Sequence, residues 1–204
     1  NTASAMAVFS LRDDFPDVPL IGLEPAVKPA VEQTKVGRVG VLATPRTVAG
    51  ERLRWLIETY GAGVAVHRVA ATGLVELVEA GILDGPAVDA ALQPLLDPML
   101  QVGVDKLVLG CTHYPFLRAP IERYMGPGVE VIDSGAAIAR RLDAVLTETG
   151  LLRVRQETGT VRLATSGDPA VVGPIAERLR GEPVTMLDRL GDHPASPIAP
   201  ASSC

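Results

Sequence analysis

The sequence is poor in the residue types that cross-link small proteins or bind metals. Its 204 residues include only two cysteines, Cys111 and Cys204, and three histidines. Two cysteines cannot form a disulfide framework, and such low cysteine usage fits the reducing conditions of the cytoplasm. Cys111 and His113 are two residues apart, but no second ligand pair follows at a zinc-site spacing. We therefore expect a cytoplasmic protein without a metal site.

Aromatic residues and positive charge are also scarce. Aromatic residues make up 3% of the chain, and the formal net charge is −5. A mildly acidic chain lacks the basic patch that nucleic-acid binding requires. No apolar run is long enough to span a membrane, and the start lacks the basic and apolar regions of a signal peptide. The composition argues against nucleic-acid-binding and membrane-bound classes.

Aliphatic residues, by contrast, are abundant. Hydrophobic residues make up 47% of the chain, so the core must be built mainly from Ala, Val, Leu and Ile. Continuous runs of these residues are typical of parallel strands buried on both faces of a sheet. The length is sufficient for one large or two modest domains with a sizeable core.

Strand and helix patterns alternate along the chain. The predicted strands are 18–23, 36–44, 64–69, 106–110, 129–132, 161–165 and 184–187. The predicted helices are 1–15, 24–34, one from the Thr44 turn to about residue 60, 74–81, 86–102, 119–124, 136–149 and 170–180. Pro94 and Pro98 are expected to bend the helix 86–102 or to shift its start. This alternation predicts an α/β fold with right-handed crossovers, and ligands in such sheets bind beyond the carboxyl ends of the strands.

Three polar turns follow predicted strand ends and are the candidates for a site: 44–47, 111–113 and 165–168. Cys111 directly follows an apolar strand, and Gly110 would allow a ligand to approach the backbone closely. A helix beginning near residue 113 would stabilise an anion with its free N–H groups. Two interpretations of Cys111 stay open, a reactive thiol or a small buried apolar residue. A phosphatase loop is excluded, because its arginine would stand at position 117, where the chain has Leu117.

Four motifs along the chain resemble segments of one known family. The sequence GCTHYP at 110–115 resembles the second cysteine motif of glutamate racemases, and NTASA at 1–5 resembles the segment that follows their first catalytic cysteine. VGVLAT at 39–44, with Thr47 three residues later, and TSGDP at 165–169 resemble two further family segments. The matches occur in family order over nearly the whole chain. The chain departs from the family at 71–74, where ACPL is frequent, and at Arg46, where Gly is frequent.

The resemblance implies two pseudo-symmetric, parallel-sheet α/β domains with the substrate between them. Residues 24–133 would form the complete second domain, and 1–23 with 134–191 would form the remainder of an incomplete first domain. Because the chain begins at Asn1 and not at Met, we expect a leading segment with the first catalytic cysteine to be absent. The first domain would then have an unpaired sheet edge and low stability. The Pro- and Ser-rich tail, 192–204, is predicted to be disordered.

The activity that the resemblance implies is cofactor-independent interconversion of L- and D-glutamate by two thiols, which supplies D-glutamate for peptidoglycan. Racemisation removes the Cα proton from one face and returns a proton to the other, so it needs an acid/base group on each face. Cys111 would be the base for L-glutamate and the acid in the reverse direction. This chain alone, with one of the two thiols, is expected to be inactive.

The resemblance also implies supporting roles for other residues. His113 and Glu79 would assist Cys111, although a turn histidine bonded to backbone and a solvated helix carboxylate are the alternatives. The residues expected to bind glutamate are Asn1, Thr2, Thr44, Thr47 and Thr112. Without the resemblance, Thr44 and Thr47 would be interpreted as strand-end caps.

Other functions stay open beside this one. Aspartate and hydantoin racemases also use paired cysteines, but the Thr-His-Tyr-Pro sequence after Cys111 favours glutamate. A non-catalytic module that retains half of a glutamate pocket is the alternative from a different class. Glutamate is the expected partner, and a homodimer is also considered. Cys204 is interpreted as an inert tail thiol, since nothing nearby would activate it.

Overall fold

The computed structural model describes residues 2–153, 161–184 and 187–189. The chain divides into two compact units, residues 1–153 and 154–204, and each is described by itself. The predicted tail 192–204 and Asn1 lie outside the described residues.

The centre of the first unit is a four-stranded, all-parallel sheet with the order β2-β1-β3-β4. Its strands are β1 (Arg38–Ala43), β2 (Ala65–Ala70), β3 (Lys106–Leu109) and β4 (Glu130–Ile132). The two central strands, β1 and β3, are almost completely buried, as their continuous aliphatic sequences predict. The predicted parallel α/β arrangement is therefore confirmed.

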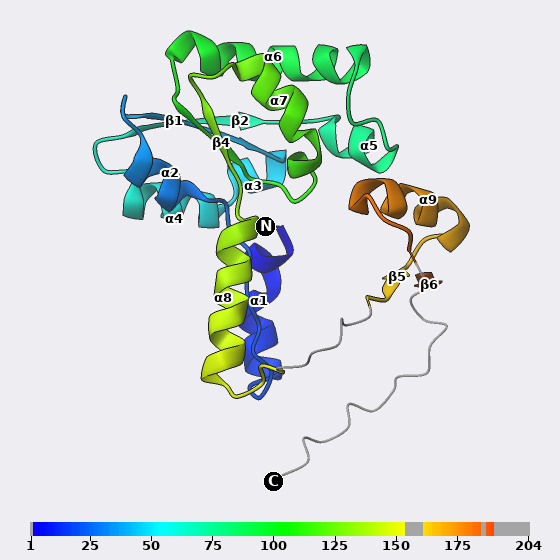
Figure 1. Ribbon diagram of the computed structural model, residues 1–204. Coiled ribbons are helices and arrows are strands. Elements are labelled where there is room, and N and C mark those ends of the chain that lie inside the picture. The colour runs from blue at the N-terminus through cyan, green and yellow to red at the C-terminus, as the bar shows by residue number, and fades with distance from the viewer. Residues whose placement is uncertain (1, 154–160, 185–186, 190–204) are drawn as a thin grey trace. The chain divides into compact units, whose positions relative to one another are not determined.

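Helices cover both faces of this sheet (Figure 1). On one face lie α6 (Pro86–Val102) and α7 (Arg118–Met125), and on the other lie α2 (Val27–Gln33) and α4 (Glu51–Tyr60). Gly40 makes room for α6, because a Cβ at this position would lie 2.9 Å from the sulfur of Met99. The helix α6 runs without interruption through Pro94 and Pro98, and neither proline shifts its start from Pro86.

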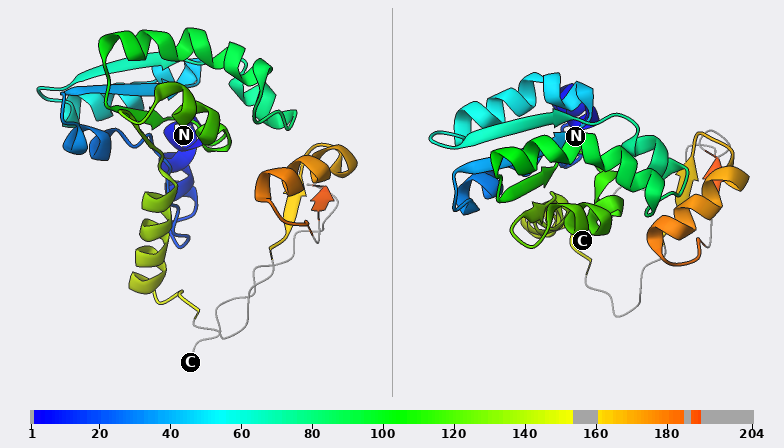
Figure 2. Two further views of the ribbon diagram at one scale, coloured as in Figure 1. Left: turned by 45° about the horizontal axis from the view of Figure 1, so that its top comes forward. Right: turned by 90° about the horizontal axis from the view of Figure 1, so that it is seen from above.

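Two further helices, α1 (Thr2–Asp14) and α8 (Gly135–Glu148), lie side by side beyond the sheet (Figures 1 and 2). The Leu23 N–H donates to Ser4 Oγ of α1 at 2.8 Å. At the junction with the sheet, the Ser134 hydroxyl donates to the carbonyl of Glu24. The segment between α1 and α2 is therefore bonded both to α1 and to the residue that precedes α8.

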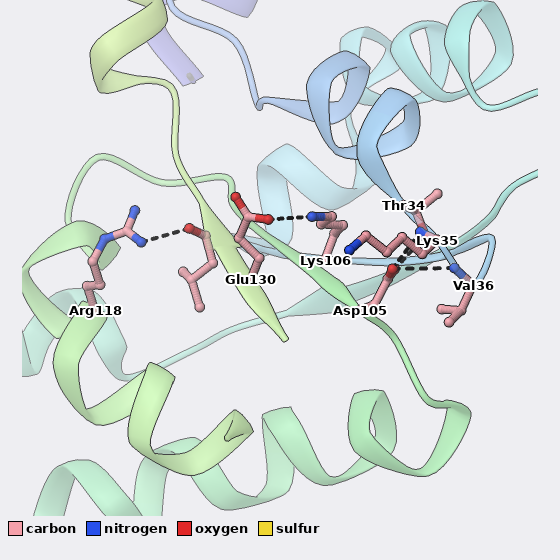
Figure 3. Close-up of polar contacts among 8 residues, drawn as sticks. Thr34, Lys35, Val36, Asp105, Lys106, Arg118 and Glu130 are labelled. Atoms are coloured by element: carbon pink, nitrogen blue, oxygen red, sulfur yellow. Dashed lines mark hydrogen bonds and ion pairs between the residues drawn. The ribbon is translucent and has the colours of Figure 1, made fainter. Parts of the chain in front are cut away.

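A polar cluster fixes the amino ends of the strands, opposite the predicted site (Figure 3). The Asp105 carboxylate accepts hydrogen bonds from the Thr34 hydroxyl at 2.5 Å and from the backbone N–H groups of Lys35 and Val36 at 2.6 and 3.3 Å. Burial raises the pKa of Asp105, but these hydrogen bonds outweigh burial and hold the pKa below its usual value. Lys106 is buried and pairs with Glu130.

Two predicted elements differ from the structure. The predicted strand 18–23 is wrong: this segment is irregular, and Pro19 cannot donate a ladder hydrogen bond. The predicted helix ending near residue 60 is two helices, α3 (Pro45–Ala49) and α4, because Gly50 between them adopts an extended conformation with ψ 144°. The remaining predicted elements of the first unit agree with the structure to within a few residues at their ends.

The second unit contains β5 (Leu163–Thr165), α9 (Pro169–Arg180) and β6 (Leu187–Arg189). The two strands pair in parallel, as the strand–helix–strand order predicts. The side chain of Asp168 caps α9 by accepting a hydrogen bond from the Ala170 N–H at 2.9 Å.

No helix within the described ranges is both long and apolar enough to cross a membrane.

Candidate active site

Cys111 lies at the carboxyl end of β3, in the turn that follows the strand. Its side chain is half-buried, so the sulfur is neither enclosed in the core nor fully in solvent. Gly110 fits closely against β1: its N–H donates to the Leu42 carbonyl at 2.8 Å, and a Cβ would lie 2.8 Å from Ala43 Cβ. The glycine therefore allows close approach of a neighbouring strand, where the sequence had suggested a ligand.

The Thr44 turn follows the end of β1, next to Gly110. Thr44 is the N-cap of α3, and its hydroxyl accepts from the Thr47 N–H at 3.3 Å and donates to Thr47 Oγ1 at 3.0 Å. Both threonines are half-buried. The capping role is thus present in the structure. The Cys111 turn and the Thr44 turn extend from adjacent strands, so they share one edge of the sheet.

His113 lies between the thiol and a carboxylate. Its Nδ1 is 3.8 Å from Cys111 Sγ, and its Nε2 is 3.1 Å from Oε1 of Glu79, the last residue of α5 (Leu74–Glu79). The Glu79 carboxylate has no proton to donate, so Nε2–H is the donor in this contact. The other ring nitrogen, Nδ1, faces the Cys111 sulfur. An imidazole held in this way can accept a proton from a thiol or donate one to a thiolate.

The contact with Glu79 is made at the surface. The Glu79 side chain is 68% exposed and that of His113 is 33% exposed. Glu79 is therefore a solvated helix carboxylate, and it also contacts His113. A hydrogen bond so exposed to water contributes little stability, so its main effect is on the orientation of the ring.

The other predicted site residues are placed as follows. Thr112 is exposed between Cys111 and His113. Thr2 begins α1, with its side chain outside the described part, and Asn1 is not described. The expected helix after the thiol is a single 3-10 turn, Tyr114–Leu117. The turn 165–168 lies in the second unit.

No role was assigned from the sequence to two side chains near the site, Tyr114 and Arg118. Tyr114 is completely buried, and its hydroxyl donates to the Ala71 carbonyl at 3.4 Å. Arg118 donates to the Val131 carbonyl at 2.7 Å and to Asp133 at 2.5 Å, so it serves the β4 end and not a phosphate loop. Within the described ranges, no group of three His, Cys, Asp or Glu side chains is arranged to hold a metal ion.

Comparison with known sequences supplies the family. The model of the Asp/Glu/Hydantoin racemase family matches residues 1–142. Glutamate racemase of Herpetosiphon aurantiacus is 46% identical over 182 residues, which is 89% of this chain and 71% of that protein. Glutamate racemase of Deinococcus radiodurans is 48% identical, over 88% of this chain and 62% of that protein. The chain thus spans roughly two thirds of the length of these curated relatives.

Solved structures give the same result for the fold. The Escherichia coli glutamate racemase, in complex with L-glutamate and the activator UDP-MurNAc-Ala, has a TM-score of 0.75 at 30% identity, covering 90% of this chain and 69% of that one. The Thermus thermophilus glutamate racemase, in complex with β-chloro-D-alanine, has a TM-score of 0.74 at 33% identity, covering 93% and 69%. From these matches, the chain belongs to the Asp/Glu/hydantoin racemase family, and within that family to the glutamate racemases.

Proposed function

We propose that this chain carries one of the two acid/base thiols of a cofactor-independent glutamate racemase, and that Cys111 is this thiol. The observation that supports the proposal best is the line of Cys111, His113 and Glu79 at the carboxyl edge of the sheet, beside the Thr44 turn. The names of the relatives point to glutamate, and the Escherichia coli structure contains L-glutamate.

In the proposed reaction, the Cys111 thiolate removes the Cα proton of L-glutamate. The Cα–H bond breaks, an S–H bond forms, and the electron pair stays on the substrate's α-carbon. A second thiol on the opposite face then donates its proton to that carbon, which gives D-glutamate. In the reverse direction Cys111 is the proton donor, so each thiol alternates between acid and base.

The other residues position the reactants. His113 exchanges a proton with Cys111 and is oriented by Glu79. The substrate's charged groups would be bound by Thr44, Thr47 and Thr112, and from the other side by Asn1 and Thr2. Thr44 and Thr47 can bind glutamate without losing the α3 cap, because a hydroxyl can accept two hydrogen bonds as well as donate one.

We also propose the setting of this activity. Residues 24–133 form one complete α/β domain, and 1–23 with 134–191 belong to a second, similar domain. The product, D-glutamate, enters peptidoglycan synthesis in the cytoplasm. A homodimer of the complete enzyme is part of the same proposal.

The test is the loss of optical activity of L-glutamate, followed by circular dichroism with a full-length protein that contains this chain. Cys111→Ala should lower the racemisation rate about 10³-fold, as expected for removal of an acid/base group. Cys204→Ala is the matched control and should retain the rate. A Cys111→Ala variant that still racemises glutamate at the parent rate would contradict the proposal.

The same assay separates the rival functions. L-aspartate should be racemised at least about 100-fold more slowly than L-glutamate, because the polar groups that bind the side-chain carboxylate would be left without their partner. Faster turnover of L-aspartate would favour the aspartate branch of the family. A full-length protein that binds glutamate without converting it would favour the non-catalytic module. The 204-residue chain alone should show no racemisation.

A further inference from the structure

We propose that Tyr114 is a positioning residue, whose hydroxyl holds the Cys111 turn in register with the carboxyl ends of β1 and β2. The inference deepens the proposed function, since it concerns the residue that aligns the thiol with its histidine and carboxylate. The claim that Tyr114 holds the Cys111 turn in place rests only on the contacts of Tyr114 and does not require that the protein is a racemase.

A continuous series of hydrogen bonds crosses three strand ends through this side chain. The Tyr114 N–H donates to the Cys111 carbonyl at 3.2 Å, which closes the turn after β3. The Tyr114 hydroxyl donates to the Ala71 carbonyl at 3.4 Å, just beyond β2. The Ala71 N–H donates to the Ala43 carbonyl at 2.8 Å, at the end of β1. In this series, Tyr114 is the one link formed by a side chain.

Burial makes this link costly to break. Tyr114 is completely buried and Ala71 is 3% exposed, so water has little access to replace the bond. A buried carbonyl that loses its donor pays the cost of desolvation without a hydrogen bond in return. Burial, with smaller contributions from the charges of Cys111 and Glu76, also raises the pKa of Tyr114 well above its usual value. The phenol is therefore protonated and remains a donor at neutral pH.

The same link connects the two halves of the candidate site. Cys111 and His113 lie in the turn that Tyr114 closes, whereas Glu79 lies at the end of α5, which begins three residues after Ala71. The 3-10 turn containing Tyr114 packs against α5. By bonding the Ala71 carbonyl, the Tyr114 hydroxyl fixes the separation between the Cys111 turn and α5. The 3.1 Å contact of His113 with Glu79 depends on this separation.

The test compares two tyrosines whose hydroxyl groups have different hydrogen-bond partners. Tyr114→Phe removes the link to Ala71. Tyr124→Phe is the matched control, because the Tyr124 hydroxyl donates to Asp97 at 2.5 Å between α7 and α6, away from the Cys111 turn. Both changes are made in the 204-residue chain with Cys204→Ser, so that alkylation by iodoacetamide reports on Cys111 alone.

At pH 7, Tyr114→Phe should accelerate alkylation of Cys111 about fivefold, because the turn opens more often, and Tyr124→Phe should change it less than about 1.5-fold. In the full-length enzyme, Tyr114→Phe should lower kcat about tenfold with KM changed less than about twofold, as expected when alignment and not binding is lost. Alkylation at the parent rate in Tyr114→Phe, with unfolding midpoints lowered alike in both variants, would overturn the inference. If the full-length protein does not racemise glutamate, the alkylation result still decides the positioning role, so the two proposals fail separately.

A measurement on the unmodified chain covers the case in which Tyr114→Phe does not fold. Hydrogen exchange of the Ala71 and Tyr114 amides should be slowed to a similar degree, within about tenfold, because one opening event breaks both bonds. A strongly protected Ala71 amide beside an unprotected Tyr114 amide would show that the phenol does not tie the two segments together, and would overturn the inference as well.

Discussion

The sheet with its covering helices, residues 24–133, and the helix pair α1 and α8 use apolar residues in opposite ways. In the sheet region, large aliphatic side chains on strands and helices alike are completely buried, among them Leu42, Leu92 and Leu107. In α8, Val145 is the only buried residue, while Leu142 is 46% exposed. In α1, Phe9 is 65% exposed. Similar apolar content therefore gives a core in one region and an uncovered surface in the other.

The difference shows that an apolar helix face stabilises a protein only where another element covers it. In the sheet region, α2, α4, α6 and α7 pack on strands that offer continuous aliphatic faces. The candidate site stands on this region, since Glu79 ends α5, and Cys111 and His113 lie in the turn after β3. Acid/base groups must be held within a fraction of an ångström, and a densely packed platform provides this precision.

The largest expected difference concerns two leucines, each in the interior of a helix, one buried and one exposed. Leu92→Ala in α6 should lower the free energy of unfolding by about 3 kcal/mol, because it leaves a cavity in the core. Leu142→Ala in α8 should lower it by less than about 1 kcal/mol, since the side chain is nearly half in solvent. Urea unfolding measures both. Equal losses would show that Leu142 is covered in solution.

The second prediction concerns local opening. Amides of α1 and α8 should exchange about 100-fold faster than those of β1 and β3, because few buried contacts oppose the opening of the helix pair. Hydrogen exchange followed by mass spectrometry or NMR measures this ratio. Equal protection in both regions would contradict the comparison, and would indicate that α1 and α8 are covered by contacts that form in solution.

The third prediction concerns Asp105 at the amino ends of the strands. Asp105→Asn should cost about 1 kcal/mol at pH 7, because a charged acceptor of three hydrogen bonds is replaced, and partial exposure limits the loss. Since the folded-state pKa of Asp105 is lowered, its contribution is present above the usual Asp pKa and is lost as pH falls through the folded-state value. The parent and the variant should therefore converge in stability at low pH. A gap that is constant from pH 7 to the acid limit would contradict this assignment.

The smallest effect is expected at the surface of α4. Arg54 pairs with Glu51 at 3.4 Å and Glu58 at 3.9 Å, but all three side chains are exposed. Arg54→Ala should change the free energy of unfolding by less than about 0.5 kcal/mol. Thermal or urea unfolding checks this, and a loss comparable to that of Leu92→Ala would mean that surface ion pairs carry the stability of this region.

Local sequence signals were sufficient for elements with clear boundaries. The bounds predicted for the helix 86–102 agree with the structure, in which Pro86 occupies the first turn and Gly103 ends the helix in the left-handed conformation. The strand 18–23 was wrongly predicted because an apolar run does not reveal whether a strand is available to pair with it. The break at Gly50 was missed because helical periodicity continues on both sides of it.

The candidate site was predictable to different degrees. The proximity of Cys111 and His113 follows from their spacing in one turn. The contact of His113 with Glu79 joins residues 34 positions apart, and only the family resemblance pointed to it. The bond from Tyr114 to Ala71 spans 43 positions and joins a side chain to a backbone carbonyl, so no local pattern could indicate it.

The central claim is that the Cys111 sulfur exchanges a proton with the α-carbon of glutamate. The most direct test is deuterium uptake at Cα, followed by NMR in D₂O, with a full-length protein that contains this chain. Deuteration of L-glutamate should fall about 10³-fold in Cys111→Ala and stay unchanged in Cys204→Ala. Deuteration of L-glutamate at the parent rate in Cys111→Ala would contradict the claim.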